Sequence, residues 1–384
     1  MSRLRLVVYT DFSYRKQGDS VTAQLPFVLF IDALSEAEVE LSVVGRLDSG
    51  SDPFPFALAP EIGFTGLPGY PSLANPGAVV GVARRTMRTF SRATAGADAV
   101  WLFGPHPFAF GFAAIAAARR QRVILGVRQN LPELIARRRS SSRWLRLSAR
   151  LLEHSYRLLS RRCDTVVVGA DLAAAYGASR RLLNLPISLV REAQVVSLEE
   201  AVARPQGERL TAISVGRLDP EKNPLLLADV LLELRRRDPR WQLEVYGGGS
   251  LAEPLRRRLS ELGLAEHATL RGYVPVDDGL VDAYRRADAL LHVSWTEGVP
   301  QVLFEAFAAG LPIVATEVGG VAEAVGDAAL LVGPGAAEPA AEALARIGRD
   351  PDLRRSLIER GLHRVADLTI EQQVRRALDF VAAG

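Results

Sequence analysis

Short apolar runs alternate with longer amphipathic segments along the whole chain. This alternation is typical of strands and helices that follow each other around parallel sheets. In the first half the pattern predicts strands at residues 4–10, 40–44, 99–103, 122–127 and 165–168. In the second half it predicts strands at residues 210–215, 242–246, 268–271, 289–293, 313–315 and 329–332. We therefore expect an α/β protein whose second half repeats the architecture of the first.

A polar stretch at residues 197–207 separates the two series of strands. The chain has 384 residues, which is long for one domain and sufficient for two domains with cores of their own. We predict a first doubly wound domain over 1–200, a second over 201–365, and a final helix over 366–384 that packs back on the first. Ligands of open α/β sheets bind at the carboxyl ends of the strands, so function is expected in a cleft between the two domains.

Composition excludes several classes of protein. The single cysteine, Cys163, leaves no internal disulfide and no cysteine-based metal site, which fits a reducing cytoplasm. No apolar run is long enough to span a bilayer. The net charge of +3 is low and no nucleic-acid-binding motif is present, so nucleic acid is not an expected partner.

Residues 52–76, which are rich in proline, glycine and aromatic residues, are expected to form a long loop without regular structure.

The segment SWTEGVPQVLFEAFAAG carries two carboxylates on either side of an apolar run. Glu297 is predicted in a loop above the end of a buried strand, and Glu305 in the helix that Pro300 begins. Both acids could therefore reach one ligand lying across the amino terminus of that helix. The backbone amides near residues 298–301, together with the helix dipole, suit a phosphate group.

A second segment, SVGRLDPEKN, displays two cations directly after another strand. Arg217 and Lys222 are the kind of paired positive charge that a diphosphate requires. Lys222 is one of only two lysines, the other being Lys16, in a chain with 45 arginines.

Five motifs occur in order between residues 210 and 335: SVGRLDPEKN, VYGGGS, GYVP, an acid followed by seven residues and a second acid in EGVPQVLFE, and GLPIVATEVGG. Together they resemble the carboxyl-terminal half of the retaining glycosyltransferases of family four. This resemblance implies the GT-B fold, in which two Rossmann-like domains face each other across a cleft. It also implies a nucleotide diphosphate sugar as donor substrate, with no other cofactor. No metal is expected, because no Asp-x-Asp motif lies in a suitable loop and the pair of cations makes a divalent ion unnecessary.

The resemblance also implies roles for individual residues. Glu297 would contact the donor sugar, Glu305 the ribose, and Arg217 with Lys222 the diphosphate. His106, which follows the strand at 99–103, is at a position similar to an active-site histidine of the family; the alternative is a histidine that caps the next helix. Catalytic residues are thus expected at Glu297, His106, Arg217 and Lys222. The expected donor-binding set is Gly216, Arg217, Lys222, Gly247, Gly248, Gly272, Tyr273, Glu297, Gly298, Val299, Pro300 and Glu305.

The first loop departs from the family pattern. The family has a glycine-rich turn after the first strand, whereas TDFSYRKQGDS retains only Gly18. Ser13, Tyr14, Arg15 and Lys16 are expected in that loop, where a cationic or hydroxyl contact would replace close backbone approach. Arg128 and Asn130 end a strand on the same side and are weaker candidates.

Residues 136–162 hold nine arginines and one acid, Glu153, interleaved with large apolar residues. Such a segment could rest on anionic lipid as a basic amphipathic helix. The alternative is a solvated arginine face over an ordinary core-facing stripe. A cytoplasmic protein is expected in either case, with peripheral membrane contact in the first.

These features predict an enzyme that moves a sugar from a nucleotide diphosphate sugar to a hydroxyl-bearing acceptor with retention of configuration. The resemblance implies that the departing diphosphate itself takes the proton of the acceptor, so no protein nucleophile is required. Two alternatives stay open: a nucleotide-sugar epimerase on the same fold, and a catalytically silent subunit that binds the donor. A nicotinamide dehydrogenase is disfavoured, because no Gly-x-Gly-x-x-Gly motif follows the first strand.

Overall fold

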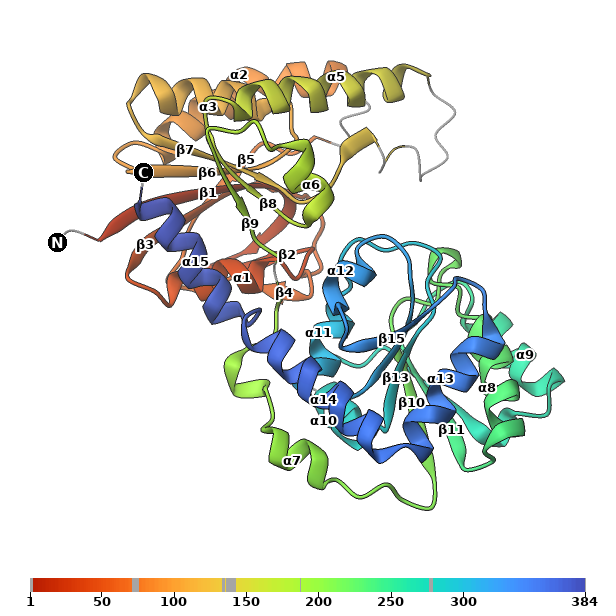
Figure 1. Ribbon diagram of the computed structural model, residues 1–384. Helices are drawn as coiled ribbons and strands as arrows, with labels where there is room; N and C mark the ends of the chain where they lie inside the picture. The colour runs from red at the N-terminus through yellow and green to blue at the C-terminus, as the bar shows by residue number, and fades with distance from the viewer. Residues whose placement is uncertain are drawn as a thin grey trace. The chain divides into compact units, whose positions relative to one another are not determined.

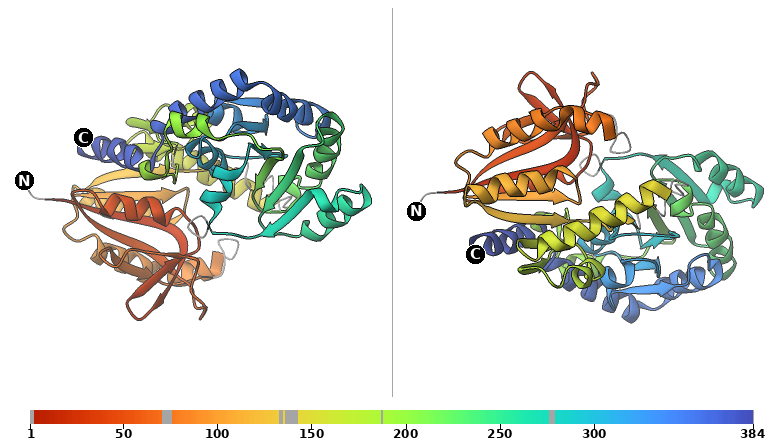
Figure 2. Two further views of the ribbon diagram at one scale, coloured as in Figure 1. Left: turned by 90° about the horizontal axis from the view of Figure 1, so that it is seen from below. Right: turned by 90° about the horizontal axis from the view of Figure 1, so that it is seen from above.

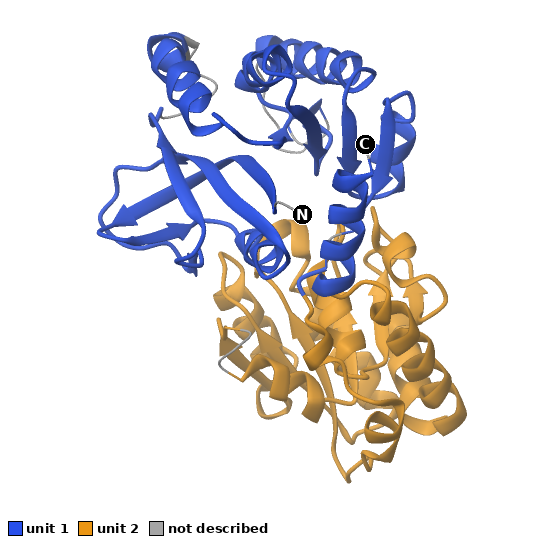
Figure 3. Ribbon diagram, turned by 90° about the vertical axis from the view of Figure 1, so that its left-hand side faces the viewer, with its two compact units in different colours: residues 1–189, 370–384 blue, residues 190–369 orange. Residues whose placement is uncertain are grey.

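The computed structural model describes residues 3–70, 76–132, 135, 143–186, 188–275 and 279–383. The chain forms two compact units, which Figure 3 shows in different colours. Unit 1 consists of residues 1–189 together with 370–384, and unit 2 consists of residues 190–369. The predicted domain bounds of 1–200, 201–365 and 366–384 remain a prediction.

The described part of unit 1 contains a nine-stranded sheet (Figure 1). The parallel part has the order β5-β3-β1-β6-β7-β8-β9. β2 pairs antiparallel with residues 14–17 at the carboxyl end of β1, and β4 pairs antiparallel with β2. The order reverses between β1 and β6. The strands are β1 (Leu4–Gln17), β2 (Ser20–Ala23), β3 (Val39–Leu47), β4 (Phe56–Ala57), β5 (Gly63–Leu67), β6 (Ala99–Gly104), β7 (Arg122–Val127), β8 (Asp164–Val167) and β9 (Arg181–Asn184).

Helices cover both faces of this sheet. Alternate residues of β1 point to two separate cores: Leu6 and Val8 pack with α1 and α15, and Val7 and Tyr9 pack with α3. The right-hand view of Figure 2 shows α2 in orange and α5 in yellow on the face of this sheet that α3 also covers. Among the described residues, the helices of unit 1 with assigned bounds are α1 (Val28–Ser35), α2 (Pro76–Ala93), α3 (Phe108–Ala118), α5 (Arg143–Ser160), α6 (Ala170–Ala175) and α15 (Ile370–Ala382). The last helix of the chain thus belongs to unit 1.

Three features of unit 1 contradict the sequence predictions. Residues 10–17, predicted as a loop, continue β1 past an irregularity between Thr10 and Ser13, and Gly18 lies in the turn into β2. The region 52–76 is not irregular throughout, because β4 and β5 form within it; residues 71–75 lie outside the described residues. β9 was not predicted. It is only half-buried at the edge of the sheet, so it lacks the apolar run that marks an inner strand.

Unit 2 contains a six-stranded parallel sheet with the order β12-β11-β10-β13-β14-β15. In order of appearance this is 3-2-1-4-5-6, the doubly wound arrangement that binds ligands where the order reverses. The reversal lies between β10 and β13. The strands are β10 (Leu210–Val215), β11 (Trp241–Tyr246), β12 (Ala268–Gly272), β13 (Ala289–His292), β14 (Ile313–Thr316) and β15 (Ala329–Val332).

The helices of unit 2 connect these strands and bury two cores, one on each face of the sheet. They are α7 (Leu198–Ala203), α8 (Leu226–Arg237), α9 (Ala252–Glu261), α10 (Leu280–Arg286), α11 (Gln301–Ala308), α12 (Val321–Val325), α13 (Ala337–Arg349) and α14 (Pro351–Ala366). Within the described part of the chain, none of the helices has the length and apolar character needed to cross a bilayer.

Candidate functional site

The two motifs with charged residues meet at the reversal point of unit 2. β10 and β13 are hydrogen-bonded neighbours, so the segments after them leave the sheet side by side. The backbone amide of Trp295 donates to the carbonyl of Glu221 at 2.9 Å, which ties the two segments together. Residues 216–222 and 294–300 therefore form one site, although about 75 residues separate them along the chain.

An ion pair between Lys222 and Glu297 lies at the centre of this site. Lys222 Nζ is 2.5 Å from Glu297 Oε1, and the carboxylate side chain is only 7% exposed. A buried carboxylate in a low-dielectric environment requires such a partner. Sequence reasoning selected both residues, but it did not predict that they contact each other.

Two further side chains hold Glu297, and sequence reasoning missed both. Ser294 Oγ donates to Glu297 Oε1 at 2.6 Å, and His292 Nε2 lies 3.0 Å from the same oxygen. Both residues are buried. A histidine in the otherwise apolar run ALLHVS was the signal that could have identified them.

Burial alone would raise the pKa of Glu297, but the hydrogen bond from His292 and the charge of Lys222 outweigh it. Together they lower the pKa of Glu297 to about 2, so this acid is ionised at neutral pH.

The loop after β14 packs against the backbone of Glu297 and Gly298. A Cβ atom at Gly319, whose φ is +53°, would overlap the backbone carbonyl of Glu297. The amide of Gly320 donates to the carbonyl of Gly298 at 3.0 Å. The glycine pair of the EVGG motif therefore allows close backbone packing behind the acid.

The second acid, Glu305, lies on α11 and is half-buried. Tyr284 Oη on α10 donates to Glu305 Oε2 at 2.8 Å. Burial raises the pKa of Glu305, and the bond from Tyr284 offsets part of that effect. Pro300, predicted as the first residue of the helix, is instead the N-cap residue of α11, one position earlier, and it offers no side-chain acceptor to the first amides of the helix.

Glycines bring three strand ends close together in the same region. The amide of Gly247 donates to the carbonyl of Gly272 at 2.7 Å, and a Cβ atom at Gly247 would overlap the carbonyl of Gly216. The amide of Leu218 donates to the carbonyl of Gly248 at 2.8 Å. Tyr273, directly after Gly272, is 73% exposed.

Arg217 points to acids of its own loop. Its guanidinium lies 2.8 Å from Asp219 Oδ2 and 2.7 Å from Glu221 Oε1. The side chain is 65% exposed, so these exposed pairs bind it weakly. An incoming anion could compete with them for the guanidinium.

His106 belongs to unit 1 and follows β6, at the reversal point of that sheet. Its Nδ1 accepts a hydrogen bond from the amide of Phe108 at 3.2 Å, which places the ring proton on Nε2. Nε2 in turn lies 2.6 Å from the hydroxyl of Tyr70. Burial, assisted by the charge of Arg46, lowers the pKa of His106 to about 3, so the ring is neutral at pH 7.

Arg46 connects this histidine pair to β1. Its guanidinium donates to Ser13 Oγ at 2.9 Å and to the carbonyl of Tyr70 at 3.0 Å. Neither Arg46 nor Tyr70 was predicted, because Arg46 was assigned to the region after a strand and Tyr70 to an irregular loop.

The weaker candidates of unit 1 have identifiable neighbours. Arg15 pairs with Asp48 at 2.8 Å, and Lys16 is exposed on β1. The guanidinium of Arg128 lies 4.3 Å from the ring centre of Phe12 and 4.8 Å from that of Phe27. Burial lowers the pKa of Arg128, and the charge of Asp11 opposes that shift.

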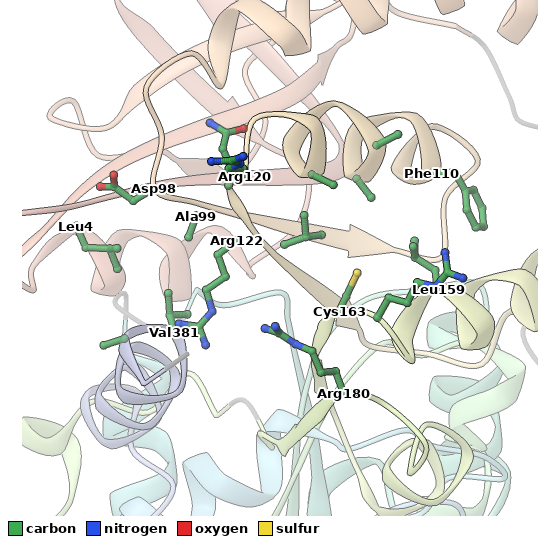
Figure 4. Close-up of a pocket in the computed structure, with 17 residues that line it drawn as sticks. Leu4, Asp98, Ala99, Phe110, Arg120, Arg122, Leu159, Cys163, Arg180 and Val381 are labelled. Atoms are coloured by element: carbon green, nitrogen blue, oxygen red, sulfur yellow. The ribbon is translucent and has the colours of Figure 1, made fainter.

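A hollow of about 760 Å³ lies elsewhere in unit 1 (Figure 4). Ala99 and Arg122, the first residues of β6 and β7, line it, so it is at the amino ends of these strands. Arg122 and Arg180 both point to the buried Asp164. Ligands of doubly wound sheets bind at the opposite ends of the strands. We therefore do not assign the hollow to the candidate site.

Comparisons with known proteins bear on unit 2 and on the fold. Residues 198–364 match the family described as glycosyl transferases group 1. A GDP-mannose-dependent alpha-(1-6)-phosphatidylinositol monomannoside mannosyltransferase of Mycolicibacterium smegmatis is 34% identical over 40% of this chain. A D-inositol 3-phosphate glycosyltransferase of Nocardia farcinica is 34% identical over 57% of it. The match spans less than half the length of either relative, 43% and 46% respectively.

Solved structures resemble nearly the whole chain. A sucrose-phosphate synthase from Thermosynechococcus elongatus superposes with a TM-score of 0.70 at 17% identity and covers 99% of both chains. The Anabaena protein HepE, solved with UDP and glucose, superposes with a TM-score of 0.66 at 16% identity and covers 98% of this chain and 100% of its own. At such identities the likeness concerns the fold, which is GT-B with two Rossmann-like units.

Proposed function

Because residues 198–364 match the family described as glycosyl transferases group 1, we propose that this chain transfers a sugar from a nucleotide diphosphate sugar to a hydroxyl-bearing acceptor. The transfer proceeds with retention of configuration and without a metal ion. The donor binds to unit 2, and unit 1 binds the acceptor.

One observation carries the proposal: the contact between Lys222 and Glu297 at the reversal point between β10 and β13. It joins a cation suited to a phosphate and an acid suited to sugar hydroxyls in the place where this sheet architecture binds ligands. An adjacent cation, Arg217, and the amino terminus of α11 supply further positive potential.

The chemistry follows from these charges. The bond between the anomeric carbon and the diphosphate oxygen breaks, and a bond to the acceptor oxygen forms on the same face of the sugar. The acceptor proton passes to the departing diphosphate. Negative charge grows on the phosphate as the bond breaks, so fixed cations at that position lower the barrier. Lys222, held in place by Glu297, is the cation best placed for this role.

Glu297 and Glu305 would bind hydroxyl groups of the donor. The low pKa of Glu297 keeps it a hydrogen-bond acceptor at neutral pH. Glu305 would exchange its bond with Tyr284 for a ribose hydroxyl or keep Tyr284 as an orienting partner. In unit 1 both ring nitrogens of the neutral His106 already have partners, the amide of Phe108 and the hydroxyl of Tyr70, so the ring would bind a sugar hydroxyl only in exchange for Tyr70.

A donor screen tests the proposal. The chain is heated with UDP, GDP, ADP and dTDP sugars in turn, including GDP-mannose and UDP-glucose. A ligand present at one hundred times its Kd stabilises a protein by about 2.7 kcal/mol, which is a readily measured increase in Tm. We expect one nucleotide class to raise the Tm, and the anomeric NMR signals of the product to show retention. If no nucleotide sugar raises the Tm, the proposal is wrong.

A catalytically silent subunit that binds the donor is the second candidate. One observation favours it: β1 continues through residues 10–17 where the family has a glycine-rich turn. Calorimetry combined with a transfer assay separates the two candidates, since a silent subunit would bind the nucleotide sugar but form no glycosylated product with any acceptor tested.

A further inference from the structure

Helix α5 (Arg143–Ser160) turns an unusual face to the core of unit 1. Its buried residues are Ala149, Glu153, Tyr156 and Ser160, so no large aliphatic residue is fully buried on it. Glu153 Oε1 accepts hydrogen bonds from Tyr176 Oη at 2.9 Å and from Arg157 Nε at 3.2 Å. Polar bonds, two tyrosines and the half-buried Leu159 thus attach the helix to the core.

The large apolar residues of α5 face outward instead. Trp144 is 68% exposed, Leu147 60%, Leu151 64% and Leu158 46%. At about 100° per residue, these four positions fall on one stripe, roughly opposite the buried residues. The sequence alternative of an ordinary core-facing stripe therefore does not apply to them. Leu145, Leu152 and Leu159 are half-buried beside the stripe.

A row of arginines runs along one edge of this stripe. Arg143, Arg146 and Arg150 are exposed and follow each other at helical spacing. The one acid of the helix, Glu153, is buried and neutralised by Arg157. The outward face of α5 therefore combines exposed apolar side chains with uncompensated positive charge among its described residues.

We propose that this face of α5 binds to the surface of a bilayer that contains anionic phospholipids. The apolar stripe would enter the boundary between headgroups and acyl chains, and the arginines would contact lipid phosphates. The helix is about 27 Å long, so it would lie in the plane of the membrane surface. The exposed tryptophan suits the same boundary.

Charge complementarity favours a lipid surface over a second copy of this chain. In a two-fold symmetric dimer built on α5, each copy would bring the same arginine row to the interface, and the two rows would repel each other. An anionic membrane offers the opposite charge over the full length of the helix. The proposal is independent of sugar transfer, because binding to vesicles requires neither donor nor acceptor.

Co-sedimentation of the full chain with lipid vesicles tests the proposal. Two kinds of vesicle are used, phosphatidylcholine alone and an equal mixture of phosphatidylcholine with phosphatidylglycerol. We expect wild-type protein to bind the mixed vesicles and to bind neutral vesicles far less. The variants Leu147→Gln/Leu151→Gln and Arg146→Gln/Arg150→Gln should each weaken binding at least about tenfold.

Matched controls sit outside this face. Leu29, 38% exposed, is on α1 at the opposite face of the sheet, and Arg256, 61% exposed, is on α9 of unit 2. Leu29→Gln and Arg256→Gln should bind mixed vesicles like the wild type. All variants should unfold at the wild-type temperature, because the substituted side chains are exposed.

Three results would overturn the proposal. The first is wild-type binding that does not depend on anionic lipid. The second is unchanged binding by both double variants. The third is a dimer in solution that Leu147→Gln/Leu151→Gln dissociates while the wild type ignores vesicles, which would identify the face as an interface between copies.

Discussion

At the scale of single residues, the site depends on how Glu297 is held. One carboxylate oxygen contacts Lys222, Ser294 and His292 within 3.0 Å, and the side chain is nearly buried. The contribution of this network to the free energy of unfolding depends on pH, because the pKa of Glu297 in the folded protein is about 2 against an ordinary value of 4.5.

The variant Glu297→Gln tests this network. The folded-state pKa is depressed, so the stabilisation by Glu297 is present above about pH 4.5 and is lost as the pH falls towards about 2. The shift corresponds to about 3 kcal/mol. We expect the stability difference between wild type and Glu297→Gln to shrink by that order over this pH range, measured by urea denaturation. Parallel stability curves would contradict the assignment.

The pair of His106 and Tyr70 gives a second prediction. Removing the hydroxyl in Tyr70→Phe leaves the buried Nε2 proton of His106 without its 2.6 Å partner. An unpaired buried donor costs about 1–3 kcal/mol, so the free energy of unfolding should fall by that amount. Tyr273→Phe, at a position 73% exposed, is the matched control and should change stability by less than about 0.5 kcal/mol. Equal effects of the two substitutions would show that the pair contributes nothing.

At the scale of elements, the strands of unit 2 were the predictable part. All six fall at the predicted places to within one residue, because apolar residues either fill each strand or alternate along it, as in β11 and β12. In unit 1 the sequence did not reveal β2, β4, β5 and β9. β5 carries two glycines and is half-buried over most of its length, and β9 is a half-buried edge strand, so neither shows a strand pattern.

Contacts between residues of different elements could not be predicted from the sequence pattern either. The pattern indicated that Lys222 and Glu297 each follow a strand, but not that these two strands are neighbours. The contacts of Ser294 and His292 with Glu297 were not predicted, because both residues lie in or directly after an apolar strand and were assigned to it. Likewise Tyr70 and Arg46 acquire a role only once β3 lies beside β1.

The turn after β14 gives a prediction at this scale. Gly319→Ala places a methyl group against the carbonyl of Glu297 in a left-handed backbone conformation, so the loop must move. We expect the affinity for the nucleotide sugar to fall at least about tenfold, in step with a displacement of Glu297. Gly333→Ala is the control, because a Cβ atom there meets nothing within 4 Å. Donor titrations of the two variants check the prediction, and equal affinities would refute it.

At the scale of the whole molecule, both sheets share one design. In each sheet the strand order reverses beside the first strand, between β1 and β6 in unit 1 and between β10 and β13 in unit 2. A candidate residue follows β6 in the first case and β13 in the second. That residue is His106 in unit 1 and Glu297 in unit 2. The division of labour that we propose follows from the charges at these two places. Unit 2 offers cations for a diphosphate, whereas unit 1 offers a neutral histidine and hydroxyl groups.

The chain provides an unusually clean test of this account, because it has only two lysines. Calorimetric titration with the nucleotide sugar found in the donor screen is carried out on wild type, Lys222→Met and Lys16→Met. Hydrogen bonds to charged groups contribute about 1.5–3 kcal/mol, so Lys222→Met should weaken donor binding about tenfold to a hundredfold. Lys16→Met should bind the donor like the wild type, because Lys16 lies on β1 of unit 1 and the proposed donor site belongs to unit 2. Wild-type affinity in Lys222→Met would contradict the claim that this lysine holds the diphosphate.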